Sequence, residues 1–164
     1  MNAIDFMTRV EEDGLRFYEM LGRETGNVEL KEIFTLLADN QKRHLSTLTA
    51  LRVTLDKAVT DEVTVPDSYY RNNGFRQLMR NPDILAVLQN DPDGFGHVVT
   101  TEEEIISVLE GLAVCDPQKA ICKVMQRIAN DEKKHLSKIE NIYDFVEAPH
   151  SYLEWGEFSN LTPL

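Results

Sequence analysis

The sequence predicts an all-α fold, a four-helix bundle in which a long crossover joins two antiparallel helix hairpins. Four segments carry apolar residues at the three-and-four spacing of an amphipathic helix, namely residues 3–25, 28–57, 100–115 and 118–147. The connections inside each pair are short, and short connections place neighbouring helices antiparallel. The segment between the two pairs, residues 58–99, is long enough to run the length of a bundle.

The first helix pair is expected over residues 3–57. Gly22 and Gly26 lie between its two helices, and we expect the turn there because glycine is a poor helix former. Each helix should turn one stripe of residues inward. The predicted inward residues are Ile4, Met7, Glu11, Gly14, Tyr18 and Leu21 in the first helix, and Leu30, Phe34, Leu37, Gln41, His44, Leu48, Leu51 and Leu55 in the second.

The crossover, residues 58–99, contains Pro66, Pro82 and Pro92 together with several glycines. Proline and glycine interrupt helices, but short apolar patches lie between them. We therefore expect one or two short helices in this segment.

The second helix pair is expected over residues 100–147. Thr100 and Thr101 precede three glutamates, which is typical of a helix N-terminus. Asp116-Pro117 should separate the two helices, and Ala148-Pro149 should end the last one. The predicted inward residues are Glu102, Ile105, Leu109 and Leu112 in the third helix, and Ile121, Met125, Ile128, Glu132, His135, Ile139, Ile142 and Val146 in the fourth.

Residues 148–164 form an aromatic tail that includes Trp155 and Phe158. We expect this tail to pack on the bundle or on a second subunit, since large apolar side chains are usually buried. The whole chain, residues 1–164, is expected to form a single domain.

Composition excludes several classes of function. The net charge is −11, with 28 acidic against 17 basic residues, which argues against a surface that binds nucleic acid. The sequence has no apolar run long enough for a membrane span. Its first residues lack the basic start and apolar stretch of a signal peptide, so a cytoplasmic location is expected.

The two cysteines, Cys115 and Cys122, do not form a C-x-x-C motif. We interpret them as buried or partly buried thiols at a helix–helix turn rather than as a redox pair. Because the sequence has no paired C-x-x-C motifs, a zinc knuckle and a rubredoxin-type iron site are both excluded.

The two helix pairs repeat one polar pattern at an offset of 91 residues. His44 follows Glu11 by 33 residues, and His135 follows Glu102 by the same 33 residues. The text between them also aligns without a gap, with LLADNQKRHLS at residues 36–46 and RIANDEKKHLS at residues 127–137. This repeat predicts a polar site near a pseudo-two-fold axis of the bundle.

Six polar residues fall on the inward stripes. A buried ionised carboxylate is costly unless it is paired or bound to metal. All six lie near the middle of their helices, so antiparallel packing should bring them to one level. Bundle di-metal sites take a glutamate from each of two helices and a Glu-x-x-His motif from each of the other two, a ligand set suited to iron or manganese. The candidate metal ligands are therefore Glu11, Gln41, His44, Glu102, Glu132 and His135, and a metal-free buried network is the alternative.

The two halves differ at one of these positions. Glu132 begins a complete Glu-x-x-His motif, whereas Gln41 begins Gln-x-x-His. An amide oxygen can bind a metal but is neutral and bridges two ions poorly. Gln41 therefore favours weaker, asymmetric or single-ion binding, or a site that has lost its metal. Two roles for Gln41 are given equal weight: it binds the metal itself, or it hydrogen-bonds to a residue that does.

These motifs resemble the rubrerythrin branch of the ferritin-like superfamily. The resemblance rests on Glu11 with Gly14 and Phe17-Tyr18, on Leu37-Ala38 with His44, on Glu102, and above all on residues 129–136. It implies a ferritin-like di-iron carboxylate site that handles ferrous iron, dioxygen or peroxide. It implies two iron ions, or one, with manganese or zinc as alternatives. The sequence departs from the family at Gln41, at Val99, where peroxidase members carry an extra acid, and in having no rubredoxin domain.

Two functions remain open from the sequence. The first is a rubrerythrin-like protein that binds iron and oxidises Fe(II), either as a ferroxidase or as a peroxidase-like oxidoreductase. In that case Tyr18 is expected to reach a carboxylate, with an electron-relay role as the alternative. The second is a degenerate bundle without a working di-metal site that acts as a dimeric binding or scaffold protein. A homodimer or higher homo-oligomer is expected in either case, and the first function would also need an external electron donor.

Overall fold

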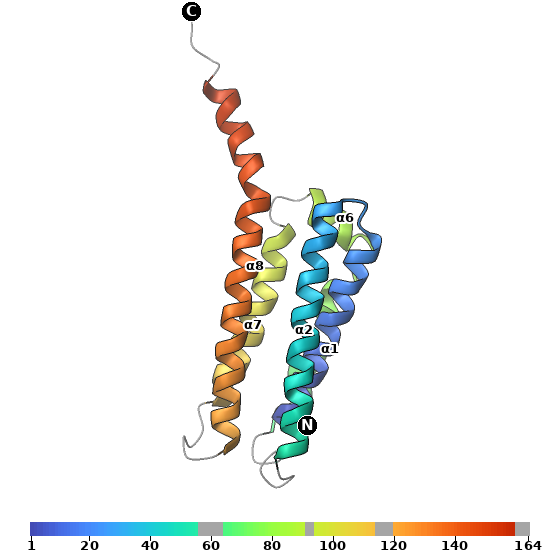
Figure 1. Ribbon diagram of the computed structural model, residues 1–164. Helices are drawn as coiled ribbons and strands as arrows, with labels where there is room; N and C mark the ends of the chain where they lie inside the picture. The colour runs from blue at the N-terminus through green and yellow to red at the C-terminus, as the bar shows by residue number, and fades with distance from the viewer. Residues whose placement is uncertain (56–63, 91–93, 114–119, 160–164) are drawn as a thin grey trace, which may run out of the picture.

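The computed structural model describes residues 1–55, 64–90, 94–113 and 120–159, the last range as backbone only from residue 142 onward. It confirms the predicted all-α bundle of two helix hairpins joined by a crossover (Figure 1). Four long helices form the hairpins, α1 (Ala3–Glu24) with α2 (Val28–Thr54), and α7 (Gly94–Ala113) with α8 (Ala120–Ser159). Short helices lie in the described part of the crossover, namely α4 (Asp67–Arg71), α5 (Gly74–Leu78) and α6 (Ile84–Asn90).

Local capping fixes the start of both helices in the first hairpin. The Asn2 side chain accepts a hydrogen bond of 2.8 Å from the backbone N–H of Asp5 at the start of α1. The Asn27 side chain accepts one of 3.1 Å from the N–H of Leu30 in the first turn of α2. Each cap satisfies one of the backbone donors that a helix N-terminus leaves unpaired.

The inward stripes lie where the sequence places them. All six predicted positions of α1 are buried, and so are Ile105 and Leu109 of α7 and Met125, Ile128 and Ile139 of α8. Phe34, Leu37, Gln41 and Leu48 are buried in the middle of the second stripe, whereas His44 there, Leu30, Leu51 and Leu55 toward its two ends, and Leu112 of α7 are half-buried. Ile121, Ile142 and Val146 lie outside the described side chains.

The crossover packs on the two hairpins. α4 and α5 lie against α1, and α5 and α6 lie against α7. Phe75 of α5 enters an aromatic cluster with Phe17 and Tyr18 of α1, with ring centroids 5.4 to 5.6 Å apart. An extended contact between Asn2 and Thr64 ties the start of the crossover to the N-terminus. The crossover thus covers the middle of α1, where the predicted site lies.

Several helix boundaries differ from the sequence prediction. α7 begins at Gly94 rather than near residue 100, because Gly96 keeps a negative φ and continues the helix. α8 continues through Pro149 to Ser159, so the predicted end of the second pair at residue 147 and a separate tail from 148 are wrong (Figure 1). Proline removes one backbone donor, but its fixed φ is compatible with a helix. The described part of the crossover, residues 64–90, already has three short helices rather than one or two. The tail side chains, including Trp155, lie outside the described residues.

The interpretation of Cys122 as a free thiol is wrong. Cys122 is buried and disulfide-bonded. Cys115, the other cysteine of the sequence, lies outside the described residues. Spacing alone did not indicate the bond, because two cysteines without a framework of others give no pattern to read.

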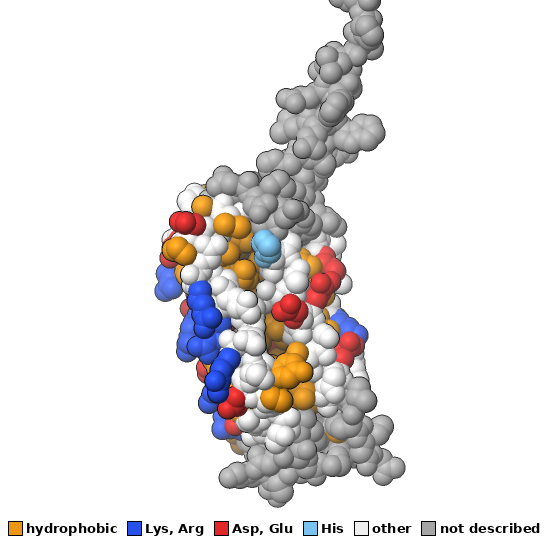
Figure 2. Space-filling view, turned by 180° about the vertical axis from the view of Figure 1, so that it is seen from behind, with side chains coloured by type: hydrophobic (Ala, Val, Ile, Leu, Met, Phe, Trp, Pro, Cys, Tyr) orange, Lys and Arg blue, Asp and Glu red, His pale blue; other side chains and the backbone are white. Residues whose placement is uncertain are grey.

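The surface carries both signs of charge. On the face shown in Figure 2, most Lys and Arg side chains gather along one edge, whereas Asp and Glu side chains are scattered over the face, with hydrophobic side chains exposed among them. This face is therefore not uniformly basic, as a surface that binds nucleic acid would be. Within the described residues, none of the helices combines the length and apolar character that a membrane span requires.

Candidate metal centre

Four helices contribute the six predicted ligands. Glu11 lies on α1, Gln41 and His44 on α2, Glu102 on α7, and Glu132 and His135 on α8. Five of them are buried to 3 % exposure or less, and the sixth, His44, has a side chain that is 21 % exposed. The neighbouring acids Glu12, Glu103 and Glu104 are exposed, so the helix phase chosen from the sequence is correct.

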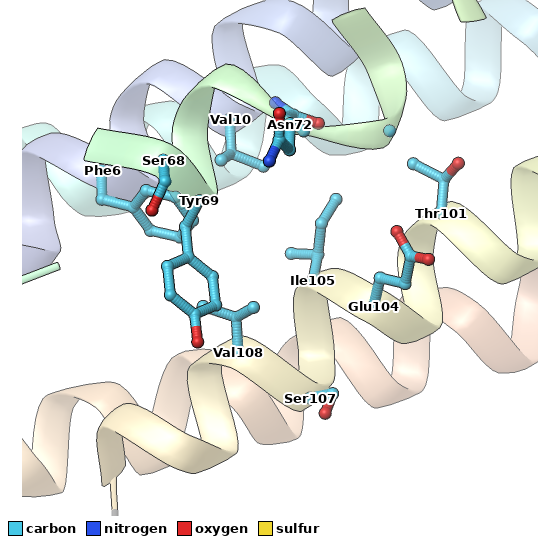
Figure 3. Close-up of a pocket in the computed structure, with 12 residues that line it drawn as sticks. Phe6, Val10, Ser68, Tyr69, Asn72, Thr101, Glu104, Ile105, Ser107 and Val108 are labelled. Atoms are coloured by element: carbon cyan, nitrogen blue, oxygen red, sulfur yellow. The ribbon is translucent and has the colours of Figure 1, made fainter. Parts of the chain in front are cut away.

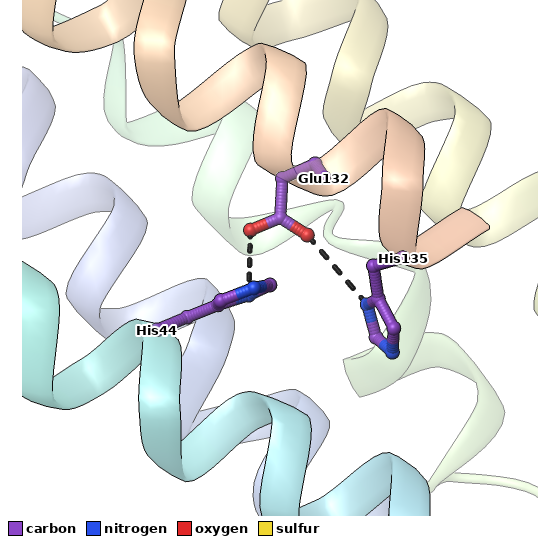
Figure 4. A group of neighbouring side chains, drawn as sticks. All are labelled: His44, Glu132 and His135. Atoms are coloured by element: carbon purple, nitrogen blue, oxygen red, sulfur yellow. Dashed lines mark ion pairs between the residues drawn. The ribbon is translucent and has the colours of Figure 1, made fainter. Parts of the chain in front are cut away.

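Glu132 lies between two imidazole rings (Figure 4). Its Oε1 is 2.8 Å from Nδ1 of His44, and its Oε2 is 3.7 Å from Nδ1 of His135. The two rings are nearly perpendicular, with centroids 5.6 Å apart. One potential ligand atom from each of the three residues lies within 4.8 Å of the others. α2 and α8 therefore bring two imidazoles and one carboxylate to a single point.

The two remaining glutamates have different partners. Glu11 Oε2 is 3.4 Å from Nδ1 of His44. Glu102 Oε1 accepts a hydrogen bond of 2.8 Å from the hydroxyl of Tyr18, which is completely buried. This bond confirms that Tyr18 reaches a carboxylate, and it links α1 of the first half to α7 of the second.

Most of the polar atoms at the centre of this group have no hydrogen bond to any group that the structure describes. The buried atoms without a partner include Glu11 Oε2, His44 Nδ1, Glu132 Oε1 and both ring nitrogens of His135. The 2.8 Å between His44 and Glu132 is an ion-pair distance, but the ring N–H is not aligned with the oxygen. Buried donors and acceptors are normally paired, so this concentration of unpaired atoms calls for an explanation.

A metal ion would satisfy one ring nitrogen of each histidine together with the carboxylate oxygens that face them. Imidazole nitrogens and carboxylate oxygens are ligands of iron, manganese and zinc, and all bind through lone pairs that a hydrogen bond would otherwise occupy. The donor set of this site therefore fits the metal that the sequence pattern predicts.

Electrostatics couples the carboxylates to the histidines. Burial alone would raise the pKa of Glu132, but the close approach of the His135 and His44 rings and the charge of His44 outweigh burial and hold that pKa at about 2. Burial would lower the pKa of His44, whereas Glu11 and Glu132 raise it to about 10. Without metal, His44 is therefore a cation between two acids, and Glu132 is ionised.

Glu11 and Glu102 behave differently from Glu132. Burial raises the pKa of Glu11 well above its usual range, and the neighbouring charge of Glu132 raises it further. Burial also raises the pKa of Glu102 to about 7, despite the opposing effect of His135. Burial next to Glu102 raises the pKa of Tyr18 well above its ordinary value, so Tyr18 stays protonated and donates. A cation at this point would favour the ionised form of both glutamates.

Gln41 is buried on α2, one helical turn before His44, and one atom of its amide is unpaired among the described residues. It is 1 % exposed, and its Oε1 has no hydrogen-bond partner. Its amide packs on Gly14, where an added Cβ would lie 3.1 Å from Cδ and 3.2 Å from Nε2 of Gln41. An unpaired amide oxygen leaves Gln41 able to bind an ion weakly.

One further buried acid, Asp13, lies outside the set of predicted ligands, and its burial was not predicted from the sequence. It is 3 % exposed and lies near Arg16, Arg76 and Asn73, at 3.7, 4.0 and 3.5 Å. Arg76 also stacks on the ring of Tyr70 at 4.7 Å. Two of these partners lie 60 or more residues away in the crossover, so no local pattern could reveal the contact. This cluster fastens the crossover to α1.

The surface cavity in Figure 3 is separate from the metal centre. Its volume is about 520 Å³, and it lies between α1, α4 and α7. Phe6 and Val10 of α1 and Ile105 and Val108 of α7 supply apolar lining, and Thr101 supplies a polar group. None of the six predicted ligands lines it.

Comparison with known proteins agrees with this geometry. The family model described as rubrerythrin matches residues 4–143, which include both hairpins and all six predicted ligands. Comparisons with curated proteins and with solved structures give no match. The helix order, the convergent histidines and glutamate, and the length of the match lead to one conclusion: the chain belongs to the rubrerythrin family.

Proposed function

We propose that this protein binds iron among its four long helices and oxidises Fe(II) with peroxide or dioxygen. The observation that carries the proposal is the convergence of His44, Glu132 and His135, with buried nitrogen and oxygen atoms that no group of the described residues satisfies. Iron supplies one-electron chemistry that none of these side chains offers by itself. Manganese and zinc suit the same donors, but zinc has no redox chemistry.

Each side chain has a separate task in this proposal. His44 and His135 each offer one neutral nitrogen, and Glu132 offers an oxygen toward each ring. Glu11 lies on the His44 side, where it adds a carboxylate. The hydroxyl of Tyr18 orients Glu102 through a hydrogen bond and keeps one of its oxygens engaged.

The protein also controls water and protons at the site. Glu11, Glu102, Glu132 and His135 are 3 % exposed or less, so bulk water is excluded from most of the ligand set. His44 is the most exposed of the six and offers the route by which protons reach solvent. The proposal also includes an external electron carrier, which would reduce the oxidised protein again. It further includes self-association of the chain into a homodimer or higher homo-oligomer.

One observation favours a second function, a metal-free bundle that acts as a dimeric binding or scaffold protein. The His44 cation lies between Glu11 and Glu132, so the buried charges already balance in part without metal. Gln41, in place of a fourth glutamate, has the same effect because it removes one buried negative charge.

Anaerobic Fe(II) titration followed by one equivalent of peroxide separates the two functions. We expect bound Fe(II) to be oxidised faster than Fe(II) in the same buffer, followed by the rise of ferric absorbance. The control is His135→Ala, which removes one ligand and should return the rate to that of free Fe(II). Equal rates with the protein, the variant and buffer alone would contradict the oxidase proposal. Failure to retain Fe(II) in dialysis would favour the scaffold.

A further inference from the structure

The metal centre is not symmetric between the two halves of the bundle. A two-ion site built on the repeat would use a carboxylate at residue 41 and another at residue 132. Only Glu132 is a carboxylate, and it faces both histidines at once. Gln41 is fully buried at the equivalent position, with an unpaired Oε1 and no charge.

Charge balance distinguishes one bound ion from two. Ions in two-metal sites lie only about 3.5–4 Å apart, so their mutual repulsion must be offset by anionic ligands between and around them. Two divalent ions against Glu11, Glu102 and Glu132 leave one net positive charge in a buried site. One divalent ion leaves one net negative charge. A net charge of either sign in a buried site costs free energy unless a neighbouring polar group stabilises it.

The structure provides a group for the negative excess. The Tyr18 hydroxyl donates a hydrogen bond of 2.8 Å to Glu102, so that carboxylate is stabilised without an ion. For the positive excess, the one further buried side-chain acceptor without a partner among the described residues, beyond the three glutamates and two histidines, is the neutral amide oxygen of Gln41. The other buried acid of the first half, Asp13, already lies against Arg16 and Arg76. The described residues therefore accommodate one ion better than two.

We propose, as an inference that rests on the proposed function, that the bundle binds one divalent ion and that Gln41 excludes a second. His44, Glu132 and His135 bind this ion, and Glu11 lies beside it. Two histidines and one carboxylate form a ligand set that leaves coordination positions open for small molecules. Glu102 remains with Tyr18 and does not bind the ion. The site is then a mononuclear derivative of a duplicated scaffold, and residue 41 determines how many ions enter.

Manganese titration of the metal-stripped protein tests this inference without any measurement of activity. We expect one equivalent of Mn(II) to bind, and its six-line electron paramagnetic resonance signal to account for all bound metal. Gln41→Glu restores the missing carboxylate and should bind two equivalents, with loss of six-line intensity because two neighbouring ions couple. Asn40→Asp adds the same charge at the adjacent buried position and should still bind one.

Each outcome decides the inference. Two equivalents in the native protein, or a coupled signal at saturation, would overturn the one-ion site. One equivalent in a folded Gln41→Glu variant would overturn the role of residue 41, with circular dichroism as the check on folding. If that variant does not fold, the native stoichiometry decides alone. Binding of no ion by the native protein would overturn this inference together with the proposed function.

Discussion

The α1–α2 and α7–α8 hairpins share one sequence pattern, but their polar residues differ in ways that make the two hairpins complementary rather than equivalent. Both keep a buried glutamate on the first helix and a histidine on the second. The first hairpin has Tyr18, whose hydroxyl binds Glu102 of the second hairpin. The second has Glu132, whose carboxylate pairs with His44 of the first. The repeat thus positions the site, whereas the differences between its copies determine the chemistry.

The largest expected effect is on metal affinity, and it distinguishes residues 132 and 41, which occupy equivalent positions in the two hairpins. Glu132→Gln removes the carboxylate that faces both rings, and we expect metal affinity to fall by at least about 100-fold, since loss of an outer partner alone costs 10- to 100-fold. Gln41→Ala should cost less than about 10-fold, because a neutral amide contributes little to a divalent ion. Competition with a chromogenic chelator measures both. Equal losses would contradict the assigned asymmetry.

The pH dependence of the metal-free protein comes next. The pKa of Glu102 is about 7 in the folded protein against 4.5 ordinarily, so its contribution is full below pH 4.5 and is lost by about pH 7. The pKa of His44 is about 10 against 6.5, so its contribution is full below pH 6.5 and is lost as pH rises through 10. Glu132, at about 2, has the opposite sign and loses its contribution as pH falls below 4.5.

Urea unfolding at a series of pH values measures this dependence. We expect the free energy of unfolding to fall from pH 5 to pH 10 in the metal-free protein, with about 3 kcal/mol of the decrease due to Glu102. Glu102→Gln should remove the part between pH 4.5 and 7 and leave the part above pH 7. A profile unchanged by this substitution would show that Glu102 is not buried as described.

Tyr18 offers a smaller test of how the halves interlock. Tyr18→Phe leaves Glu102 Oε1 buried without its donor, which should lower the free energy of unfolding by about 2 kcal/mol at pH 8. Tyr69→Phe is the matched control, because Tyr69 is 52 % exposed and the change should stay within about 0.5 kcal/mol. The difference between the two variants, measured in urea, gives the value of the contact between the hairpins. No difference would contradict it.

The smallest effect concerns two helical glycines. A Cβ at Gly14 would lie 2.9 Å from Phe75 and 3.1 Å from Gln41, so Gly14→Ala should destabilise the protein by about 1 kcal/mol after the helix-forming gain of alanine. Gly111 lies in α7 with nothing within 4 Å of such a Cβ, so Gly111→Ala should stabilise by about 0.5 kcal/mol. Thermal unfolding compares the two. The same sign for both variants would refute the close packing at Gly14.

The sequence allowed the fold and the ligand positions to be predicted because both depend on local periodicity. A polar residue on an apolar stripe, such as Glu11 or His135, is visible without knowledge of its partners. Choosing Glu11 over Glu12 needed only the correct helix phase, and the burial of Glu11 bears it out. The repeat then indicated that the polar residues of all four helices lie at the same height along the bundle.

Contacts between distant segments could not be predicted in the same way. Asp13 follows two other acids and has no local sign that it is buried, since Asn73 and Arg76 reach it from the crossover. Pro149 is an ordinary stop signal, yet α8 continues past it to Ser159. The bond at Cys122 likewise depends on a distance in space rather than on spacing. In each case the deciding information lies in the tertiary structure.

Anomalous diffraction at the iron edge tests the central claim most directly, on crystals grown anaerobically with Fe(II). The account predicts a peak between α2 and α8, within about 2.0–2.3 Å of ligand atoms from His44, Glu132 and His135. Crystals of Glu132→Gln grown in the same way should lack the peak. A native map with no peak at this point, or with iron only at surface carboxylates, would contradict the account.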